Sequence, residues 1–201
     1  MPVFDDIKST LRKYTVGIAG AGGLGSNVAM ALTRVGIGRL IIADYDTVTM
    51  CNLNRQFYFS DQVSYKKVEA LKENLQRIDP EVIIEVHDLK LTSNNILDIF
   101  DEVDVMVEAF DTAEMKEVII SQFQTKLPGV PIVVGNGMAG WGNSNLLKVE
   151  QLGNLFICGD SISEVSHNEP PMAPRVGICA FMQANTVMNI LLSKKFGQKP
   201  F

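Results

Sequence analysis

The stretch YTVGIAGAGGLG, residues 14–25, decides the fold of this chain. Its first half is apolar and rich in small residues, which is typical of a buried central strand. Its second half carries glycines at positions 20, 22 and 25 and so fits the pattern GxGxxG. In that pattern a tight turn leads into a helix whose free amide groups point at a bound phosphate. The stretch therefore predicts a nucleotide-binding turn between a strand and a helix.

A second strand and an acidic residue follow the glycine turn. A helix is predicted over about 26–35, ended by Gly36, and a strand over 39–43. A right-handed crossover between two parallel strands places the glycine turn at the carboxyl edge of the sheet. Asp44 ends the second strand, about 20 residues after the turn, where a carboxylate can accept hydrogen bonds from ribose hydroxyls.

The same alternation of strand and helix continues along the chain. Further helices are predicted at 63–78, 95–100, 112–125 and 176–192, and further strands at 82–86, 103–108, 131–134, 146–149 and 155–158. The last two strands are joined by a short turn at Gly153-Asn154, which favours an antiparallel hairpin over a crossover. We therefore predict one α/β domain over residues 1–201, a Rossmann-like, mostly parallel sheet flanked by helices, with antiparallel strands at its C-terminal edge.

Composition limits the classes of function. The net charge of the 201 residues is −5, which argues against a nucleic-acid or membrane-surface role. No uninterrupted apolar run approaches the roughly 20 residues of a membrane helix, and acids stand near the start where a signal peptide carries bases. The three cysteines, Cys51, Cys158 and Cys179, form no CxxC pair, so neither a disulfide framework nor a structural zinc is predicted. We expect a cytoplasmic protein that binds neither nucleic acid nor membrane.

A polar run and two later residues distinguish ATP from a dinucleotide such as NAD or FAD. A dinucleotide carries two phosphate charges, whereas ATP carries more and needs cations around it. In the run NLNRQ, residues 52–56, Arg55 offers a planar fork for phosphate, and Lys67 further on offers a point charge. Asp111 follows the strand predicted at 103–108 and can bind Mg²⁺ through oxygen. Singly, the two cations could be solvated surface residues and Asp111 a helix cap, but the three are expected together at one sheet edge.

Four runs of sequence resemble the ThiF/MoeB/HesA family, relatives of the ubiquitin-activating enzymes. They are GAGGLGSNVA at 20–29, ADYDTVTMCNLNRQF at 43–57, KKVEAL at 66–71 and EAFDT at 108–112. The resemblance covers about residues 14–192, and it implies that Arg55, Lys67 and Asp111 are catalytic, with Asp111 holding Mg²⁺. It places Lys90 and Leu91 against adenine. The full set of nucleotide-binding positions that it implies is Gly20, Gly22, Gly23, Leu24, Gly25, Asp44, Asp46, Asn52, Asn54, Arg55, Gln56, Lys67, Lys90 and Leu91.

The reaction that this resemblance implies is an adenylation. The C-terminal glycine carboxylate of a small ubiquitin-like sulfur-carrier protein, ending in Gly-Gly, attacks the α-phosphate of ATP and releases pyrophosphate. ATP and Mg²⁺ are the implied cofactors, and family members usually pair as homodimers. The short chain without CxxC pairs most resembles a zinc-free member that acts on a ThiS-like carrier in thiamine biosynthesis. A molybdopterin-type carrier, a tRNA-modification carboxylate, an NAD-dependent oxidoreductase and a non-catalytic member are the alternative interpretations.

Two further positions follow from the resemblance. Some relatives receive the activated carrier on a cysteine, and Cys158, just before the loop predicted at 159–175, is the candidate for that thiol. Cys179 lies in an apolar predicted helix and is expected in the core. Many relatives also begin with an arginine-bearing segment that reaches a partner subunit's ATP site. Here only Arg12 precedes the first strand, which departs from that pattern, so we do not predict this contact.

Overall fold

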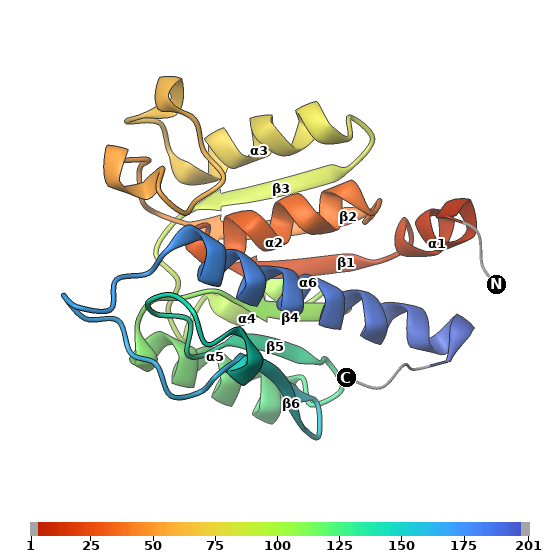
Figure 1. Ribbon diagram of the computed structural model, residues 1–201. Coiled ribbons are helices and arrows are strands. Elements are labelled where there is room, and N and C mark those ends of the chain that lie inside the picture. Colours follow the sequence, from red (N-terminus) through yellow and green to blue (C-terminus); the bar gives the residue numbers. More distant parts are fainter. Residues whose placement is uncertain (1–3, 198–201) are drawn as a thin grey trace.

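Seven strands form one sheet in the computed structural model, which describes residues 4–197 (Figure 1). Their order across the sheet is β3-β2-β1-β4-β5-β7-β6, and every pairing is parallel except that of β6 with β7. The predicted mostly parallel sheet with an antiparallel C-terminal edge is therefore confirmed. In chain order the strands are β1 (Thr15–Ala19), β2 (Arg39–Asp44), β3 (Ile83–Asp88), β4 (Val105–Glu108), β5 (Ile132–Gly135), β6 (Lys148–Leu152) and β7 (Leu155–Gly159).

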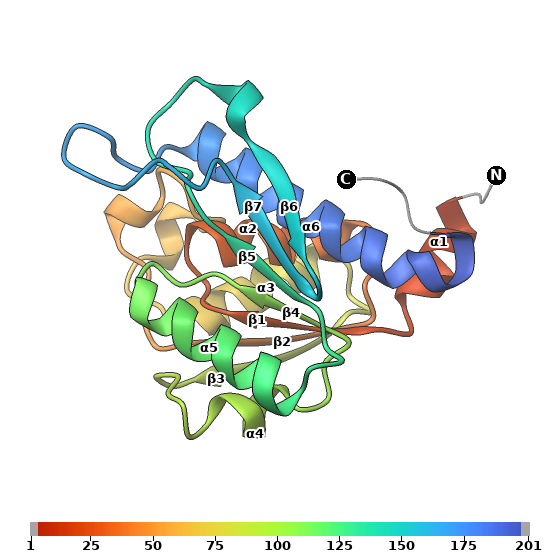
Figure 2. The same ribbon diagram turned by 90° about the horizontal axis from the view of Figure 1, so that it is seen from below.

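Helices cover both faces of this sheet (Figure 2). Apolar side chains of α2, α3 and α6 bury one face, and those of α4 and α5 bury the other. Successive residues of a strand point to opposite faces, so the central strands are apolar throughout. The helices are α1 (Phe4–Leu11), α2 (Gly23–Arg34), α3 (Lys67–Ile78), α4 (Ile96–Phe100), α5 (Ala113–Lys126) and α6 (Ala173–Phe196), with 3₁₀ turns η1 (Met50–Asn52), η2 (Ser60–Gln62) and η3 (Ser144–Leu146).

Several helix boundaries differ from the sequence prediction, each for a local reason. α2 begins at Gly23, earlier than predicted, because the glycines themselves form its first turn. α3 begins at Lys67 and not near residue 63, because Ser64 has a φ of 77°, outside helical geometry. α6 begins earlier than predicted, because Pro174 fits the first helical turn. The sequence pattern does not reveal α1, whose eight residues are too few to show a clear period.

The longest helix of the described residues, α6, is also strongly apolar. Over Ala173–Ser193 its mean hydropathy is 1.4, so by length and composition it could cross a membrane, although its sequence holds no uninterrupted apolar run. The central helix of a globular protein can meet the same criteria of length and composition. Val176, Cys179, Gln183 and Val187 of α6 are buried, and the helix lies along α2 over the sheet (Figures 1 and 2). The packing identifies α6 as a core helix of this fold.

The carboxyl ends of the six parallel strands lie at one edge of the sheet (Figure 1). β1 and β4 are neighbours there, yet the chain leaves them on opposite faces, through α2 and α5. Such a topological switch point is where open α/β sheets bind ligands. Gly20 sits at this point with a φ of 100°, and a Cβ on it would lie 2.8 Å from the carbonyl oxygen of Ala109. Only glycine fits between the two strand ends.

Two glycine substitutions should have opposite effects on stability. A Cβ added at Gly25 would overlap the carbonyl oxygen of Gly20, whereas one added at Gly177, inside α6, meets no atom. We expect Gly25→Ala to lower the free energy of unfolding by about 2 kcal/mol through overpacking. Gly177→Ala should raise it by about 0.5–1 kcal/mol, because alanine favours a helix interior. Urea unfolding measures both, and an unchanged Gly25→Ala midpoint would contradict the tight turn.

Candidate functional site

The glycine turn is held from outside by two side chains. Asp44 Oδ2 accepts a hydrogen bond from the Ala21 N–H at 2.6 Å, and the buried Tyr58 hydroxyl donates to the Ala21 carbonyl at 2.7 Å. Gly22 is the N-cap of α2 and supplies no side chain to cap it. The first amides of α2 therefore have no side-chain cap, which leaves this helix end suited to an anion.

Asp44 has a second role besides the predicted contact with ribose. Its Oδ1 accepts the Asp46 N–H at 2.8 Å, so each oxygen already holds one backbone amide. A carboxylate oxygen has two lone pairs, which leaves room for ribose hydroxyls as well. Burial, then the nearby charges of Asp44 and Asp46, raise the pKa of Tyr58, so its hydroxyl stays a donor to the turn.

The NLNRQ run folds over the start of α2. Arg55 Nη1 donates to the Cys51 carbonyl at 3.3 Å and to Asn54 Oδ1 at 2.7 Å. The stem of Arg55 runs past Gly23, where a Cβ would lie 3.6 Å from Arg55 Cγ. Asn52 Oδ1 accepts the Thr49 N–H at 2.9 Å and so shapes the turn before it. The run thus brings one guanidinium to the uncapped helix end, with the two asparagines supporting it.

Gln56 carries a buried polar atom without a partner. The residue is 9% exposed, and its Oε1 has no hydrogen bond. Its Nε2 would lie 3.8 Å from a Cβ on Gly22, so the amide faces the glycine turn across a narrow gap. Rotation of the amide exchanges a carbonyl for an NH₂ group, so Gln56 can offer either to a ligand. An orphaned amide beside a phosphate turn is what a nucleotide would satisfy.

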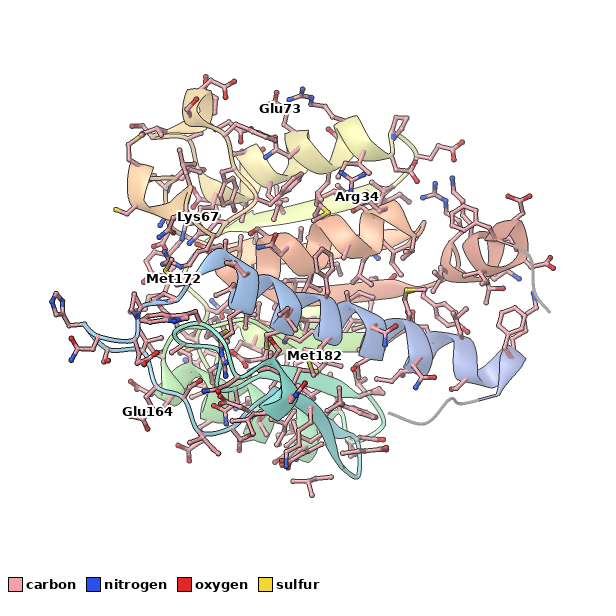
Figure 3. All side chains as sticks on the ribbon, viewed as in Figure 1. Arg34, Lys67, Glu73, Glu164, Met172 and Met182 are labelled. Atoms are coloured by element: carbon pink, nitrogen blue, oxygen red, sulfur yellow. The ribbon has the colours of Figure 1, made fainter. Side chains whose placement is uncertain are left out.

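Lys67 is a buried cation. Its side chain is 7% exposed and pairs with Asp46 at 2.7 Å, whereas its neighbour Lys66 is exposed and pairs with Asp88 at 3.1 Å. In Figure 3 Lys67 lies at the end of the molecule where the parallel strands terminate. A charge withdrawn from water and held by a single half-exposed carboxylate is costly, which sets Lys67 apart from an ordinary surface lysine.

The turn after β4 carries Asp111 at the surface. Before it, the carboxylate of the buried Glu108 accepts the Phe110 N–H at 2.6 Å and binds Lys116 Nζ at 2.8 Å. Burial raises the pKa of Glu108, against the opposing effect of Lys116. The Glu108 network fixes the backbone from which the exposed Asp111 projects.

The described residues, 4–197, contain no group of three or more His, Cys, Asp or Glu side chains placed to hold a metal ion. A Mg²⁺ ion bound at Asp111 would take its other oxygen ligands from phosphate and water, which is how magnesium commonly binds beside nucleotides. The donor set at Asp111 is therefore compatible with a metal that arrives with ATP.

The two positions implied for adenine differ in exposure. Lys90 follows β3 and is exposed, so its side chain is accessible to a ligand. Leu91 is buried in the apolar core on the α4 and α5 side of the sheet. Little of the Leu91 side chain is therefore left for a nucleotide base, and Lys90 is the more accessible of the pair.

Three polar residues that are buried or half-buried, Ser26, Asn27 and Asn74, support the site although none of them is a predicted site residue. Ser26 Oγ donates to the Gly22 carbonyl at 2.6 Å and accepts the Phe57 N–H at 3.0 Å. Asn27 donates to the Arg55 carbonyl at 2.9 Å, and Asn74 of α3 donates to the Phe57 carbonyl at 3.0 Å. These bonds join α2 and α3 to the irregular segment 47–66. Ser26 and Asn27 lie within the family run at 20–29, whereas the signal for Asn74 is a polar residue on a helix face that is otherwise apolar.

The structure argues against the thiol predicted at Cys158. Cys158 is fully buried, its Sγ lies 3.7 Å from Thr186 Oγ1, and burial raises the pKa of its thiol to about 11. A nucleophilic cysteine needs access and a depressed pKa. Cys179 is buried, as expected, and Cys51 is the exposed thiol.

Arg12 is engaged at the opposite edge of the sheet. It donates to Asp79 at 2.5 Å, to Glu81 at 3.2 Å and to the Ile37 carbonyl at 3.1 Å. A role in a partner's ATP site would require Arg12 to leave all three.

A cavity of about 550 Å³ lies between α5 and the β5 and β7 strands. α5 forms one wall, and the half-buried Leu155 and Ile157 of β7 form the other. It reaches the carboxyl edge at Gly135 and Asn136. The nucleotide candidates lie instead around β1 and β2, so the edge has two distinct halves.

Curated relatives match part of this chain in sequence. The chain is 47% identical over 90 residues to ubiquitin-like modifier-activating enzyme 5 of Caenorhabditis briggsae and 43% identical over 93 residues to that of Mus musculus. These matches cover 45% and 46% of the chain but only 21% and 23% of the relatives, so the chain spans about a fifth of their length.

Solved structures share the fold. Escherichia coli tRNA N6-threonylcarbamoyladenosine dehydratase, TcdA, in complex with ATP superposes with a TM-score of 0.87 at 19% identity, over 97% of this chain and 92% of that one. Escherichia coli MccB with ATP gives a TM-score of 0.71 at 23% identity, over 92% of this chain and 57% of that one. The sequence profile of the ThiF family matches residues 2–200. The resemblance inferred from the sequence runs is therefore confirmed: the chain belongs to the ThiF family.

Proposed function

We propose that residues 1–201 act as one adenylating domain that uses ATP and Mg²⁺ to activate the C-terminal carboxylate of a small ubiquitin-like sulfur-carrier protein. The observation that carries the proposal is the pairing of two cations with an uncapped helix end. Arg55 lies over the first turn of α2, and Lys67 is a buried cation at the same sheet edge. Two such charges exceed what a dinucleotide needs and suit a triphosphate. An NAD-dependent oxidoreductase would not need them.

In this proposal each site residue contacts a different part of the nucleotide. The amides of α2 and the Arg55 fork hold phosphates, Gln56 supplies a hydrogen bond, and Asp44 accepts from ribose. Mg²⁺, held by Asp111, would neutralise charge on the phosphate oxygens when bound. The carrier carboxylate attacks the α-phosphorus, and the bond to the pyrophosphate oxygen breaks. An acyl-adenylate and pyrophosphate result. A carboxylate is already ionised near neutral pH, so no protein base is needed.

The choice of acceptor rests on the names of the curated relatives, on the cysteine spacing and on the net charge. The curated relatives are named for ubiquitin-like modifiers, which favours a ubiquitin-like partner. The three cysteines form no CxxC pair, which favours a zinc-free enzyme of thiamine biosynthesis over the molybdopterin branch. TcdA is named for a tRNA modification, and a tRNA-linked carboxylate is the second candidate, against which the net charge of −5 weighs. We also propose that the protein is cytoplasmic and forms a homodimer.

We expect Arg55→Ala and Asp111→Ala to abolish carrier-dependent ATP–pyrophosphate exchange, by at least about 100-fold, because each removes charge stabilisation from the transferred phosphate. Both residues are partly or fully exposed, so the free energy of unfolding should change little. Arg77→Ala and Asp98→Ala are matched controls, since both positions are exposed and lie outside the site. Near-normal exchange in both site variants would refute the assignment of these residues.

The identity of the acceptor is tested with the same assay on the wild-type chain. We expect exchange with a purified thiazole-pathway carrier ending in Gly-Gly and none with the same carrier lacking its last two residues, because the attacking carboxylate is then misplaced. Exchange with a molybdopterin-type carrier alone would move the enzyme to that branch. If no carrier supports exchange and the protein binds NADH tightly, the oxidoreductase would be favoured.

The thiols should differ sharply in reactivity. Burial raises the pKa of Cys158 to about 11 and of Cys179 to about 12, so at pH 8 both are almost wholly protonated as well as inaccessible. We expect iodoacetamide to modify only the exposed Cys51 in the native protein. Peptide mass spectrometry identifies the site, and Cys51→Ser should remove it. Rapid native labelling of Cys158 would restore that residue as a candidate acceptor.

A further inference from the structure

Two loops at the β5 and β7 end of the site are fastened to each other. Loop 136–142 follows β5, and loop 160–172 follows β7; both lie at the carboxyl edge (Figures 1 and 2). The Asp160 N–H donates to the Gly137 carbonyl at 3.0 Å, and the Ser161 N–H donates to the Asn136 carbonyl at 3.1 Å. Further along, the Gly140 N–H donates to the Pro170 carbonyl at 2.9 Å. The nucleotide-binding assignments above use no residue of either loop.

A buried ion pair lies between these loops. Arg175, in the first turn of α6, donates through Nη2 to Asp160 and through Nη1 to the Gly142 carbonyl. The other oxygen of Asp160 accepts the N–H groups of Ile162 at 2.9 Å and Ser163 at 2.8 Å. Both charged side chains are at least 95% buried. One guanidinium therefore holds both loops at once.

The same helical turn contacts the phosphate-binding turn. A Cβ on Gly23 would lie 3.1 Å from Val176 Cγ1, next to Arg175 in the chain. Gly23 is also the residue that the stem of Arg55 passes. In Figure 3 Met172, the residue before α6, lies at the same end of the molecule as Lys67. Arg175 thus sits between the loops on one side and the proposed phosphate site on the other.

Stability alone does not account for this pair. A buried ion pair gains little over apolar residues of similar volume, because desolvation of both charges offsets their attraction. Arg175 Nε is also buried without a partner, an added cost. The pair instead fixes the position of one loop relative to the other. A planar guanidinium with two fixed donors sets the distance and angle between its two acceptors.

The loops carry apolar side chains into solvent. Trp141 is 70% exposed and Ile162 is 78% exposed, and each lies within two residues of a group bound by Arg175. Aromatic residues are enriched at protein–protein interfaces, so Trp141 favours contact of these loops with a polypeptide over contact with a nucleotide. The Asp160–Arg175 pair therefore holds the part of the edge that lies outside the nucleotide-binding assignments.

We propose that Asp160 and Arg175 are positioning residues that hold the loops 136–142 and 160–172 in register with the phosphate turn, so that the terminal carboxylate of the acceptor polypeptide meets the nucleotide. The inference rests on the proposed adenylation and extends it to the second substrate. Loss of the pair should impair use of the acceptor while leaving ATP binding intact.

The chain offers a closely matched control for this test. Arg12 makes the same kind of contacts at the opposite edge, with one guanidinium nitrogen on the Ile37 carbonyl and another on Asp79. Arg175→Lys and Arg12→Lys each replace a two-donor fork by a single ammonium, which cannot reproduce both bonds. Any effect that comes only from losing a two-donor fork between a carbonyl and an aspartate should appear in both variants.

Three quantities are measured on both variants and the wild type: the Kd for ATP by calorimetry, the KM and kcat for the Gly-Gly carrier in pyrophosphate exchange, and the urea unfolding midpoint. For Arg175→Lys we expect kcat/KM for the carrier to fall on the order of 100-fold, because a misplaced substrate loses that much. The Kd for ATP should stay within about twofold, since its phosphate ligands are untouched. Arg12→Lys should leave both constants at wild-type values.

The double variant Asp160→Asn/Arg175→Gln removes both charges, so no unpaired buried charge is left to unfold the protein. It should show the same loss of carrier use with retained ATP binding. Wild-type kcat/KM for the carrier in either Arg175 variant, or an equal loss in Arg12→Lys, would overturn the positioning role alone. Absence of exchange in the wild type with every carrier would overturn the proposed function, and this inference with it.

Discussion

The hydrogen bond from the Ala21 N–H to Asp44 is the constraint on which the site depends. A phosphate-binding turn must keep its helix amides unpaired, so it cannot be capped by its own side chains. It has to be held from elsewhere, and here the end of β2 holds the amide of Ala21 while Tyr58 holds its carbonyl. The turn is held by two side chains although the first amides of α2 carry no side-chain cap.

The segment 47–66 is built on the same logic. It has little regular structure of its own, so its backbone groups need partners from neighbouring helices. Ser26 and Asn27 of α2 and Asn74 of α3 supply these hydrogen-bond partners. The Asn74 amide is in turn hydrogen-bonded to the amide of Gln62. These residues are polar because the chain they support is irregular, and Ser26 and Asn74 are buried. Arg55 and Gln56 owe their positions over the glycine turn to that support, more than to local conformational preference.

The sequence was sufficient for the parts of this structure that local physics decides. Glycines at 20, 22 and 25 and the apolar strands beside them carry their own signals, so the sheet, its order of strand and helix, and the turn were all predictable. The local pattern alone did not separate Lys67 from Lys66, and the family resemblance singled out Lys67. Which of two adjacent lysines turns inward depends on where α3 begins, and Ser64 with its φ of 77° decides that. The burial of Cys158 likewise depends on α6 packing over β7, a contact between segments remote in sequence.

α6 joins the two halves of the carboxyl edge into one body. On the nucleotide side Val176 packs against Gly23; deeper in, Gln183 donates to the carbonyls of Glu108 at 3.0 Å and Val133 at 3.3 Å, bridging β4 and β5. Leu24 closes the remaining gap, because a Cβ on Gly135 would overlap its side chain. Close-packed elements of this kind have low compressibility and transmit strain to one another. The loops fastened by Arg175 are therefore positioned by the same helix that packs against the phosphate turn, and a displacement of one is transmitted to the other.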